Sequence, residues 1–365
     1  MSFAILGLGT ALPAHQVEQQ RAAEVAQTIC ARSAEEASML AHLFEHAGID
    51  TRHIVIGSAV MDDVLTGKTD TESVFLPAVS GEAGPTTRER MKVYLAEAVP
   101  LAERAAAQAL ARARSDPARI THLVTVSCTG FAAPGVDLGL MERLSLPRGV
   151  ARTHLGFMGC HGAINGLRVA QAMAEAEPAA RVLLCCVELC SIHYHYRFDL
   201  KRNVANALFA DGAAAVVGAA STAVDPWQLR GTGSYLFPDS ARAMTWTIGD
   251  RGFDMTLSTK VPDLIAGGLR PWLEEWLAGH GLTLQDIRSW AVHPGGPRIL
   301  NAVEESLCLP RPGLDVSRQI LKDHGNMSSP TVLFIVDRLR QQGAQPPCVA
   351  LAFGPGLVVE AALFE

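Results

Sequence analysis

The chain has 365 residues, 48% of them hydrophobic, and its 31 basic and 37 acidic residues give a formal net charge of -6 at pH 7. A chain of this length can bury a substantial core and is typical of about two or three domain-sized units. The Lys and Arg residues are dispersed, without a basic tail or an aromatic–basic stripe, so we expect no nucleic-acid partner and at most a local basic rim for an anionic ligand.

The first residues are apolar but lack the features of a secretion signal. No positively charged segment precedes residues 3–7, and residues 7–13 are typical of a strand that runs into a turn. No apolar run reaches the roughly 18 residues of a membrane-spanning helix. The eight cysteines include no CxxC pair, and several lie in apolar surroundings, as in proteins of a reducing compartment. We therefore expect a cytoplasmic protein with no membrane partner.

An apolar strand at residues 120–126 opens the informative part of the chain. A loop rich in Gly, Ala and Pro follows at residues 130–135, and then an amphipathic helix that ends near Pro147. The next segment turns on glycine at Gly159 and continues with helical apolar spacing to about Ala176. Strand and helix therefore alternate in this region, as in α/β proteins.

Cys160 stands at the start of that second helix. Gly159 and Gly162 on either side let the chain turn sharply and let a substrate approach the sulfur closely. The dipole and the free N–H groups at a helix N-terminus favour the thiolate, as in reactive cysteines. The alternative is a small buried cysteine in a helix start.

Cysteine and histidine cluster at the end of the next apolar strand, residues 181–186. The members of this cluster are Cys185, Cys186, Cys190, His193 and His195. It suggests zinc, but adjacent cysteines on a strand point to opposite faces, so Cys185 and Cys186 cannot easily bind one ion. We therefore expect no metal site.

The second half of the chain repeats the same elements in the same order. The repeats are a strand (287–292 after 120–126), a helix-opening turn (325–326 after 159–160) and a strand (348–353 after 181–186). Each pair is separated by nearly the same number of residues. Chance similarity among α/β units is common, but a shared displacement favours duplication.

The duplication predicts two α/β halves, residues 1–223 and 224–365, related by a pseudo-twofold axis. The second half would begin near Val224, after an apolar strand at residues 213–218. Because the strands are near-continuous apolar runs that alternate with helices, we expect parallel sheet covered on both faces. No low-complexity linker separates the halves, which indicates one compact body of stacked layers.

Two polar residues of the second half complete a candidate site with Cys160. His293 follows a strand and begins a Gly/Pro loop, the usual position of an active-site side chain in α/β proteins. Asn326 holds in the second half the position that Cys160 holds in the first. The alternatives are a helix-capping histidine and a turn asparagine, with Ser329 and Pro330 then starting the helix. A pseudo-twofold would bring the three together as nucleophile, polar partner and oxyanion donor.

Five segments together resemble a known family over nearly the whole chain. They are GFMGCHGA (156–163), NALFADGAAA (206–215), VHPGGP (292–297), GNMSSP (325–330) and FGPGL (353–357). The chain resembles type III polyketide synthases of bacterial type, the chalcone and stilbene synthase-like enzymes of the thiolase superfamily. The resemblance implies a thiolase-like fold in which duplicated αβ halves form a layered αβαβα body.

The resemblance also implies a mechanism and its residues. The implied residues are the catalytic triad Cys160, His293 and Asn326, the gatekeeper aromatic Phe209, and the turn Gly354, Pro355 and Gly356 near the site. Cys160 would take a starter acyl group from an acyl-CoA, and malonyl-CoA would lose carbon dioxide to give an enolate held by polar donors. The enolate would extend the chain, which then cyclises. The resemblance further implies a homodimer, CoA thioesters as substrates, and no bound metal or redox cofactor.

The pocket departs from the plant chalcone synthase pattern at several positions. Where the plant enzymes have small, hydroxyl or aromatic side chains, this chain has Cys128, Cys190, His193, Trp246 and Met255, while Ser328 keeps its usual type. Trp246 replaces a glycine and Met255 an aromatic residue. We therefore expect a cavity reshaped around Trp246, with a fatty acyl or small starter and a short pyrone or resorcinol-type product. The alternative is that Trp246 packs in the core behind the pocket.

Two further departures concern the surroundings of the pocket. Ala133 stands where a methionine would reach across the dimer, and two residues are missing between His193 and Asn206. A flavonoid product is therefore not expected. The sequence leaves open the starter, the number of extensions, the cyclisation mode and delivery by a carrier protein.

Three other functions stay open at this point. A β-ketoacyl-carrier-protein synthase III-like enzyme would use the same Cys, His and Asn, although the FGPGL turn favours the polyketide synthase. A cysteine acyl-thioesterase or hydrolase would need an activated water. The candidate carboxylates for that role, Asp211 and Asp323, stand next to glycine or histidine in the sequence, which suggests that they serve the structure instead. A non-catalytic thiolase-like partner protein would not need the three site residues.

Overall fold

The computed structural model describes residues 2–77, 84–221 and 227–365. A nine-stranded mixed sheet runs through the described chain in the order β11-β12-β13-β8-β1-β7-β6-β4-β5. Its strands are β1 (Ser2–Ala11), β4 (His122–Ser127), β5 (Ala151–Gly156), β6 (Arg181–Leu189), β7 (Asp211–Ser221), β8 (Gln228–Leu236), β11 (Ser289–Val292), β12 (Cys348–Gly354) and β13 (Val358–Phe364). At the centre of this order, β1 and β8 pair only through Phe3 with Leu229 and Ala4 with Gln228.

The strand order supports the predicted duplication. Outward from the centre, the first half runs β1, β7, β6, β4 and the second half runs β8, β13, β12, β11. In each half the first two pairings are antiparallel and the third is parallel. The halves therefore share one topology, and β5 is an additional strand at the edge of the first.

The prediction of parallel sheet is wrong for the inner strands of both halves. Only the pairs β4–β5, β4–β6 and β11–β12 are parallel among the described strands, and the others are antiparallel. The apolar runs report that helices cover both faces of a strand. The apolar runs do not indicate whether a strand is parallel or antiparallel to its neighbours, so the prediction of parallel sheet did not follow from them.

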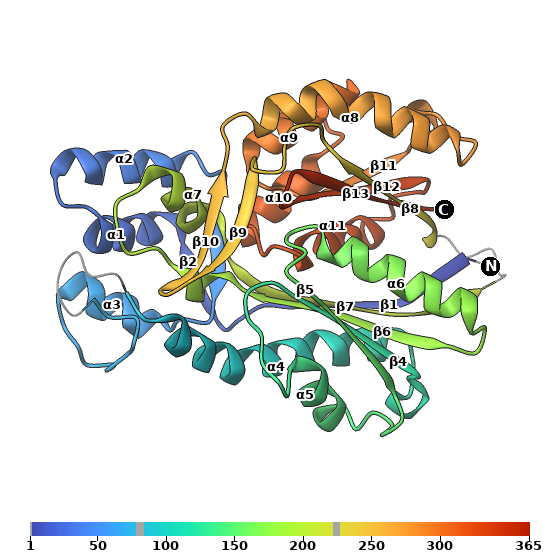
Figure 1. The fold of residues 1–365 in the computed structure, drawn as a ribbon, viewed down its shortest axis with the longest axis horizontal. Helices are drawn as coiled ribbons and strands as arrows, with labels where there is room; N and C mark the ends of the chain where they lie inside the picture. The colour runs from blue at the N-terminus through green and yellow to red at the C-terminus, as the bar shows by residue number, and fades with distance from the viewer. Residues whose placement is uncertain (1, 78–83, 222–226) are drawn as a thin grey trace.

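Helix and sheet layers alternate through the body of the molecule (Figure 1). The helices are α4 (Thr87–Arg112) and α5 (Val136–Arg143) on one outer face, α8 (Val261–Ala278) and α9 (Pro297–Leu307) on the other, and α6 (Gly162–Ala176) and α11 (Pro330–Gln341) between the two half-sheets. The central core cluster contains residues of both α6 and α11, and separate clusters lie beneath the outer helices. This is the predicted αβαβα arrangement.

Strand β6 shows how adjacent side chains divide between these layers. Cys185 packs in the core beneath α4, whereas Cys186 packs in the central core against α6. The two thiols thus point to opposite faces, as the alternation of a strand requires.

A smaller group of elements sits at one end of the body (Figure 1), and several of them contribute residues to the cavity lining. It comprises β2 (His15–Glu18), α1 (Gln19–Cys30), α2 (Ala34–Glu45), β3 (Thr51–Ile54), α3 (Ser58–Thr66), α7 (Leu200–Leu208), and the hairpin β9 (Met244–Gly249) and β10 (Gly252–Leu257). The remaining elements are α10 (Asp315–His324) and the short helices η1 (Pro117–Arg119), η2 (Cys190–His193) and η3 (Leu284–Asp286). A separate apolar cluster holds α1, α2, α3 and α7 together.

The helix end at Ala176 agrees with the prediction, and β6 runs farther than expected, to Leu189. The predicted boundary between the halves, at residues 223 and 224, lies outside the described residues. Within the described ranges, no helix combines the length and the apolar character needed to cross a membrane.

Candidate active site

A cavity of about 140 Å³ lies beside the starts of α6 and α11, and most of its wall is apolar. Its lining includes nearly all of the predicted site residues: Cys160, His293, Asn326, Phe209, Cys128, Cys190, His193, Trp246, Met255, Ser328 and Pro355. Gly354 and Gly356 flank Pro355 in the same turn. The structure therefore brings together side chains that the sequence places in both halves.

Close packing of two turns fixes the position of Cys160. Gly159 has φ +80°, and a Cβ atom on it would lie 2.3 Å from Cδ of Pro355, so only glycine fits there. His161 takes the N-cap position of α6, and its Nδ1 lies 2.7 Å from Oδ1 of Asn165. The Cys160 sulfur is thus held just before the helix, at the floor of the cavity.

Burial dominates the electrostatics of the Cys160 thiol. It raises the pKa of Cys160 to about 11, against smaller lowering effects of hydrogen bonds from Ser328 and Asn326. The expectation that the helix N-terminus favours the thiolate is therefore outweighed here by desolvation, which keeps the thiol protonated. The cause is that α6 begins two residues later, at Gly162, while desolvation acts on the sulfur directly.

His293 is fully enclosed and has a free imidazole. Its backbone N–H donates to Leu351 O at 2.8 Å, which fixes the residue at the end of β11. Neither ring nitrogen has a hydrogen-bond partner among the described residues. Burial, and to a lesser degree the nearby His161, lowers the pKa of His293 to about 3, so the ring is neutral. The capping alternative does not hold, because Gly296 is the N-cap of α9.

Asn326 is fixed through both its backbone and its side chain. It forms an isolated parallel bridge with Phe209, in which its N–H donates to Leu208 O at 2.9 Å. Its Oδ1 accepts the N–H of Ser328 at 2.8 Å. The side-chain NH₂ is therefore left as a donor, and it hydrogen-bonds Cys160. Such a donor beside a nucleophile suits an oxyanion.

The start of α11 differs from the prediction in one detail. Pro330 is the first helical residue, as expected, and Ser329 is the N-cap, but the Ser329 hydroxyl makes no capping bond. It donates instead to Glu188 Oε1 at 2.7 Å. Ser328, before it, has φ +57°, an unusual backbone for a residue with a side chain.

Glu188 is a buried carboxylate beside the site that the sequence analysis missed. It lies in β6 and accepts from the Cys128 N–H at 2.9 Å, the Thr129 hydroxyl at 2.8 Å and the Ser329 hydroxyl. Burial raises the pKa of Glu188, and these hydrogen bonds oppose that shift. The signal in the sequence was a single acidic residue in a strand that is otherwise apolar after Arg181. The carboxylates that were considered serve structure: Asp211 accepts the N–H groups of Val55 and Ser191.

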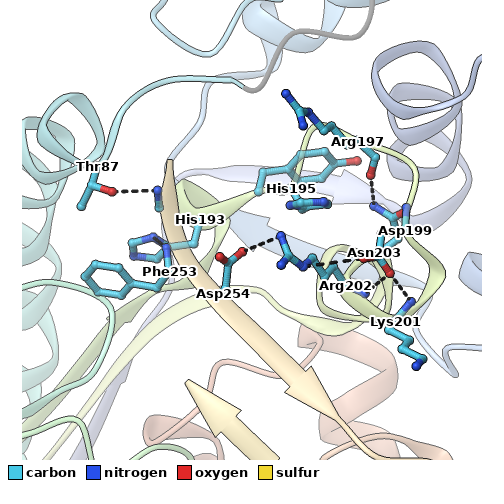
Figure 2. A network of polar contacts seen from close by, with 12 residues as sticks. Thr87, His193, His195, Arg197, Asp199, Lys201, Arg202, Asn203, Phe253 and Asp254 are labelled. Carbon is cyan, nitrogen blue, oxygen red and sulfur yellow. Dashed lines mark hydrogen bonds and ion pairs between the residues drawn. The ribbon is translucent and has the colours of Figure 1, made fainter. Parts of the chain in front are cut away.

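An aromatic wall of His193, Phe253 and Trp246 closes one side of the cavity. The His193 ring stacks on Phe253 at 4.0 Å (Figure 2). It meets Trp246 edge-on at 5.6 Å. His193 Nδ1 accepts the Phe253 N–H at 3.0 Å, so its proton is on Nε2, which donates to Thr129 O at 2.6 Å. Burial lowers the pKa of His193 to about 3. Both ring nitrogens form hydrogen bonds, which fix the orientation of the His193 ring in the cavity wall.

Trp246 and Met255 are direct partners across the β9–β10 hairpin, and both line the cavity. The indole Nε1–H donates to Cys128 O at 2.7 Å, which holds the ring across the pocket. Trp246 belongs to the cavity wall, in contrast to the alternative that it packs in the core behind it. Cys190 also lines the cavity, and burial raises its pKa well above the ordinary value.

Charged residues at the start of α7 form part of the rim. Arg202, which lines the cavity, lies 3.3 Å from Asp254 of β10 and 3.6 Å from Asp199 (Figure 2). Asp199 also caps α7 by accepting the N–H of Lys201. These contacts connect α7, which Phe209 follows directly, to the β9–β10 hairpin, which contains Trp246.

Metal-ligating side chains do not gather at the cavity in the described part of the chain. The one group of three that could hold an ion is His42, Glu45 and His46, on the exposed last turn of α2. The cavity instead offers a thiol, a neutral imidazole with free nitrogens and an amide donor. This set suits covalent acyl transfer with stabilisation of a developing oxyanion.

Comparisons with known proteins agree with this chemistry. The N-terminal domain of chalcone and stilbene synthases matches residues 2–221, and their C-terminal domain matches residues 228–365. The alpha-pyrone synthesis polyketide synthase-like Pks18 of Mycobacterium tuberculosis is 33% identical, covering 99% of this chain and 90% of that protein. The 1,3,6,8-tetrahydroxynaphthalene synthase of Streptomyces peucetius subsp. caesius is also 33% identical, covering 99% of this chain and 92% of that protein. Among solved structures, PKS-I from the brown alga Ectocarpus siliculosus matches with a TM-score of 0.92 at 30% identity, covering 100% of this chain and 98% of that chain.

Proposed function

The chain belongs to the chalcone and stilbene synthase family and is a type III polyketide synthase, and from this premise we propose that it loads an acyl-CoA starter on Cys160 and extends it with malonyl-CoA. The family predicted from the motifs is confirmed. This family replaces the three alternatives considered from the sequence, because both halves of the chain match it. Those alternatives were a carrier-protein synthase, a thioesterase and a non-catalytic partner protein. The observation that carries the proposal is that Cys160, His293 and Asn326 line the same cavity, with the Asn326 side chain hydrogen-bonded to Cys160.

Loading begins with a proton transfer inside the cavity. The Cys160 thiol gives its proton to the free imidazole of His293, and the thiolate attacks the carbonyl carbon of the starter thioester. The bond from that carbon to the CoA sulfur breaks, and the CoA thiolate takes the proton from His293. Burial disfavours either charge alone, whereas a thiolate and an imidazolium side by side attract strongly where the dielectric constant is low.

Extension uses the amide donor of Asn326 and the N–H of neutral His293. The bond between the malonyl methylene and its carboxylate breaks, carbon dioxide leaves, and the electron pair forms an enolate. The enolate oxygen accepts hydrogen bonds from the Asn326 amide and the His293 ring. The enolate carbon then attacks the thioester on Cys160, whose sulfur leaves, and the chain on CoA is two carbons longer. The apolar wall around this site limits water, which protects the enolate from protonation.

The size of the cavity favours a small starter and a short product. A cavity of about 150 Å³ holds a molecule the size of benzene, and this one is about 140 Å³. Trp246 occupies space across it and is held there by its bond to Cys128 O. Two relatives are named for alpha-pyrone synthesis and for tetrahydroxynaphthalene synthesis. We propose a short pyrone or resorcinol-type product from a small or slender aliphatic starter, which Met255 accommodates by its flexibility.

The protein is proposed to act as a homodimer. Strand β5 ends the sheet among the described strands, and its residues are mostly exposed, so its edge is open to a further strand. Phe131, 52% exposed, lies in the loop beside it and stacks on Phe253 of the cavity wall at 6.2 Å. Pairing of two copies along β5 would cover both. Mass determination in solution tests this, and a monomer at micromolar concentration that is fully active would contradict it.

The proposed function is tested with purified protein, malonyl-CoA and a panel of acyl-CoA starters of increasing length. We expect carbon dioxide release and a pyrone or resorcinol-type product by mass spectrometry, with an acyl group on the peptide that contains Cys160. Cys160→Ala should give no extended product. Malonyl-carrier protein as extender forms a second arm. Hydrolysis of the starters without carbon–carbon bond formation, or extension with the carrier protein alone, would refute the proposal.

A further inference from the structure

Arg52 is a buried cation that the mechanism above does not use. It lies in β3 opposite Val17 of β2, is 4% exposed and contributes to the cavity wall. It forms no ion pair with any carboxylate in the described ranges. Burial lowers the pKa of Arg52 to about 10, so the guanidinium stays charged at neutral pH. The buried Asp211 carboxylate attracts it without direct contact, and a buried charge with no counter-ion in contact is costly unless strong hydrogen bonds compensate it.

Those hydrogen bonds go to the end of α7. The Arg52 Nη1 donates to Phe209 O at 2.8 Å and to Asn206 O at 2.9 Å. Its Nη2 donates to Ala207 O and to the side-chain oxygen of Gln19. Gln19 in turn donates to Ala207 O at 3.1 Å. Three carbonyls within residues 206–209 therefore accept hydrogen bonds from a single side chain.

The carbonyl groups at the end of α7 can be accounted for completely. A helix leaves its last four carbonyls without partners inside the helix. Here Ala205 O accepts the Phe209 N–H at 2.9 Å, Asn206 O and Ala207 O accept from Arg52, and Leu208 O accepts the Asn326 N–H. A cation at this end also matches the negative pole of the helix dipole. Without Arg52, the buried carbonyls of Asn206 and Phe209 would lose their donor, and Ala207 O would keep only the bond from Gln19.

Phe209 and Asn326 are linked at this point. Phe209 is the first residue beyond α7, and it pairs with Asn326 in an isolated bridge whose second bond runs from the Ala210 N–H to Asn326 O at 2.8 Å. A shift of the α7 end would therefore move the gatekeeper aromatic and the amide donor together. Misplacement of reacting groups by about 1 Å can cost on the order of a hundredfold in rate.

We propose that Arg52 is a positioning residue for decarboxylation and condensation, which holds the end of α7 and thereby sets Phe209 and Asn326 against Cys160. This inference rests on the proposed function of the same site. It assigns to this buried guanidinium in the cavity wall the alignment of two groups that act on the malonyl unit. The guanidinium is needed because its planar fork presents several donors at once, which a lysine ammonium cannot reproduce on the same acceptors.

The test is a double-mutant cycle with Arg52→Lys and Phe209→Leu, read out as carbon dioxide release from malonyl-CoA. Arg52→Lys should lower kcat for decarboxylation at least about tenfold with KM within about threefold, because groups are displaced and none that binds CoA is lost. In the Phe209→Leu background the same substitution should cost less than about threefold, since residues acting through one another are not additive. Alkylation of Cys160 by iodoacetamide should change less than decarboxylation does.

Arg90→Lys is the matched control. Arg90 is likewise buried, has a pKa lowered to about 10 by burial, and donates to backbone carbonyls of Pro85, Ile192 and Tyr194. It does not touch the α7 end. Its substitution should lower the melting temperature by a similar amount to Arg52→Lys, and its effect on decarboxylation should be additive with Phe209→Leu.

The outcomes of the double-mutant cycle separate the role of Arg52 from the proposed function of the site. Additive effects of Arg52→Lys and Phe209→Leu, or a loss of stability with unchanged kcat, would overturn the proposal and leave the polyketide synthase function intact. A wild-type protein that releases no carbon dioxide would overturn both. If Arg52→Lys does not fold, Gln19→Met replaces it: this removes one acceptor that orients the guanidinium and should give a smaller loss of kcat with the same non-additivity. Full activity of a folded Gln19→Met protein, together with additivity, would count against the inference.

Discussion

The state of the Cys160 thiol gives the sharpest prediction. In the cavity the thiol and the His293 imidazole are both neutral, and neither ring nitrogen of His293 has a partner among the described residues. If the proton passes from sulfur to imidazole during reaction, then removal of the imidazole must leave an isolated buried thiol. His293→Gln keeps the polarity and approximate size of the side chain while it removes the proton acceptor. We expect this variant to lose most of the reactivity of Cys160.

The magnitude follows from the pKa of the buried thiol. At pH 7.5 a thiol with a pKa of about 11 is ionised to only about three parts in ten thousand, whereas an ordinary thiol with a pKa of about 8.5 is ionised to about a tenth. An isolated Cys160 should therefore react about 300-fold more slowly than an ordinary thiol. Since thiolate is the nucleophile, its rate should also rise about tenfold per pH unit up to pH 10.

Alkylation by iodoacetamide with peptide mapping measures this directly. Cys308 is an exposed cysteine of the same chain and supplies an internal reference. In the wild-type protein, Cys160 should be labelled before the other seven cysteines, with a rate that varies little between pH 6.5 and 8. In His293→Gln, the labelling of Cys160 should fall below that of Cys308 and gain the steep pH dependence.

An unchanged rate and pH profile in His293→Gln would refute the proton transfer. Early labelling of Cys128 or Cys190 with activity intact would refute Cys160 as the acylation site. Both of those thiols are more strongly disfavoured as thiolates, since burial and the charge of Glu188 raise their pKa values well above the ordinary one.

Three further predictions concern other residues of the site. Asn326→Ala should lower carbon dioxide release from malonyl-CoA by about a hundredfold or more, while Cys160 is still acylated by a starter; unchanged release would remove Asn326 from the mechanism. Trp246→Gly opens the cavity and frees Cys128 O, so mass spectrometry should show longer or differently cyclised products; the same products from a merely less stable protein would show that the indole does not limit the chain. Burial raises the pKa of Asp211 to about 6, above an unfolded value near 4, so its contribution to stability is fully present below about pH 4 and is lost as the pH rises through about 6. The difference in free energy of unfolding between wild type and Asp211→Asn should fall by about 3 kcal/mol over this range; a difference independent of pH in denaturant titrations would contradict this.

The sequence was informative where a residue type has a strong local meaning. The repeated strand–loop–helix units indicated the duplication, and the motifs around Gly159 and the FGPGL turn indicated residues of the cavity through the family resemblance. Such motifs are informative because glycine permits turns that other residues rarely adopt, whereas proline fixes φ. The same repeat correctly implied that the two helix starts meet. None of this required knowledge of strand direction.

The sequence was less informative about burial and partners. The thiolate expected at Cys160 came from a helix-end effect, while the pKa is governed by desolvation, which depends on residues distant in the chain. The sequence analysis did not identify Glu188, which lies in a mostly apolar strand. It predicted Ser329 as a helix cap, whereas the Ser329 hydroxyl donates a hydrogen bond to Glu188. Arg52 was not identified from the sequence, because an arginine in a short strand is expected to be exposed, and only the folded structure shows that it is buried. Such features arise only when segments far apart in the chain pack together.

The arrangement of strands has a consequence for synthesis of the protein on the ribosome. In the first half, β1 pairs along its length with β7, the last strand of that half, so this sheet cannot be completed before residue 221 has been made. Synthesis of residues 222–365 follows, and takes about 7 to 30 s at about 5 to 20 residues per second. During this interval α6 has no α11 to pack against, and the apolar face that later forms the central core is open to water. The nascent first half is therefore the species most exposed to aggregation, and yield in heterologous expression should respond to translation rate and to chaperones that bind apolar surface.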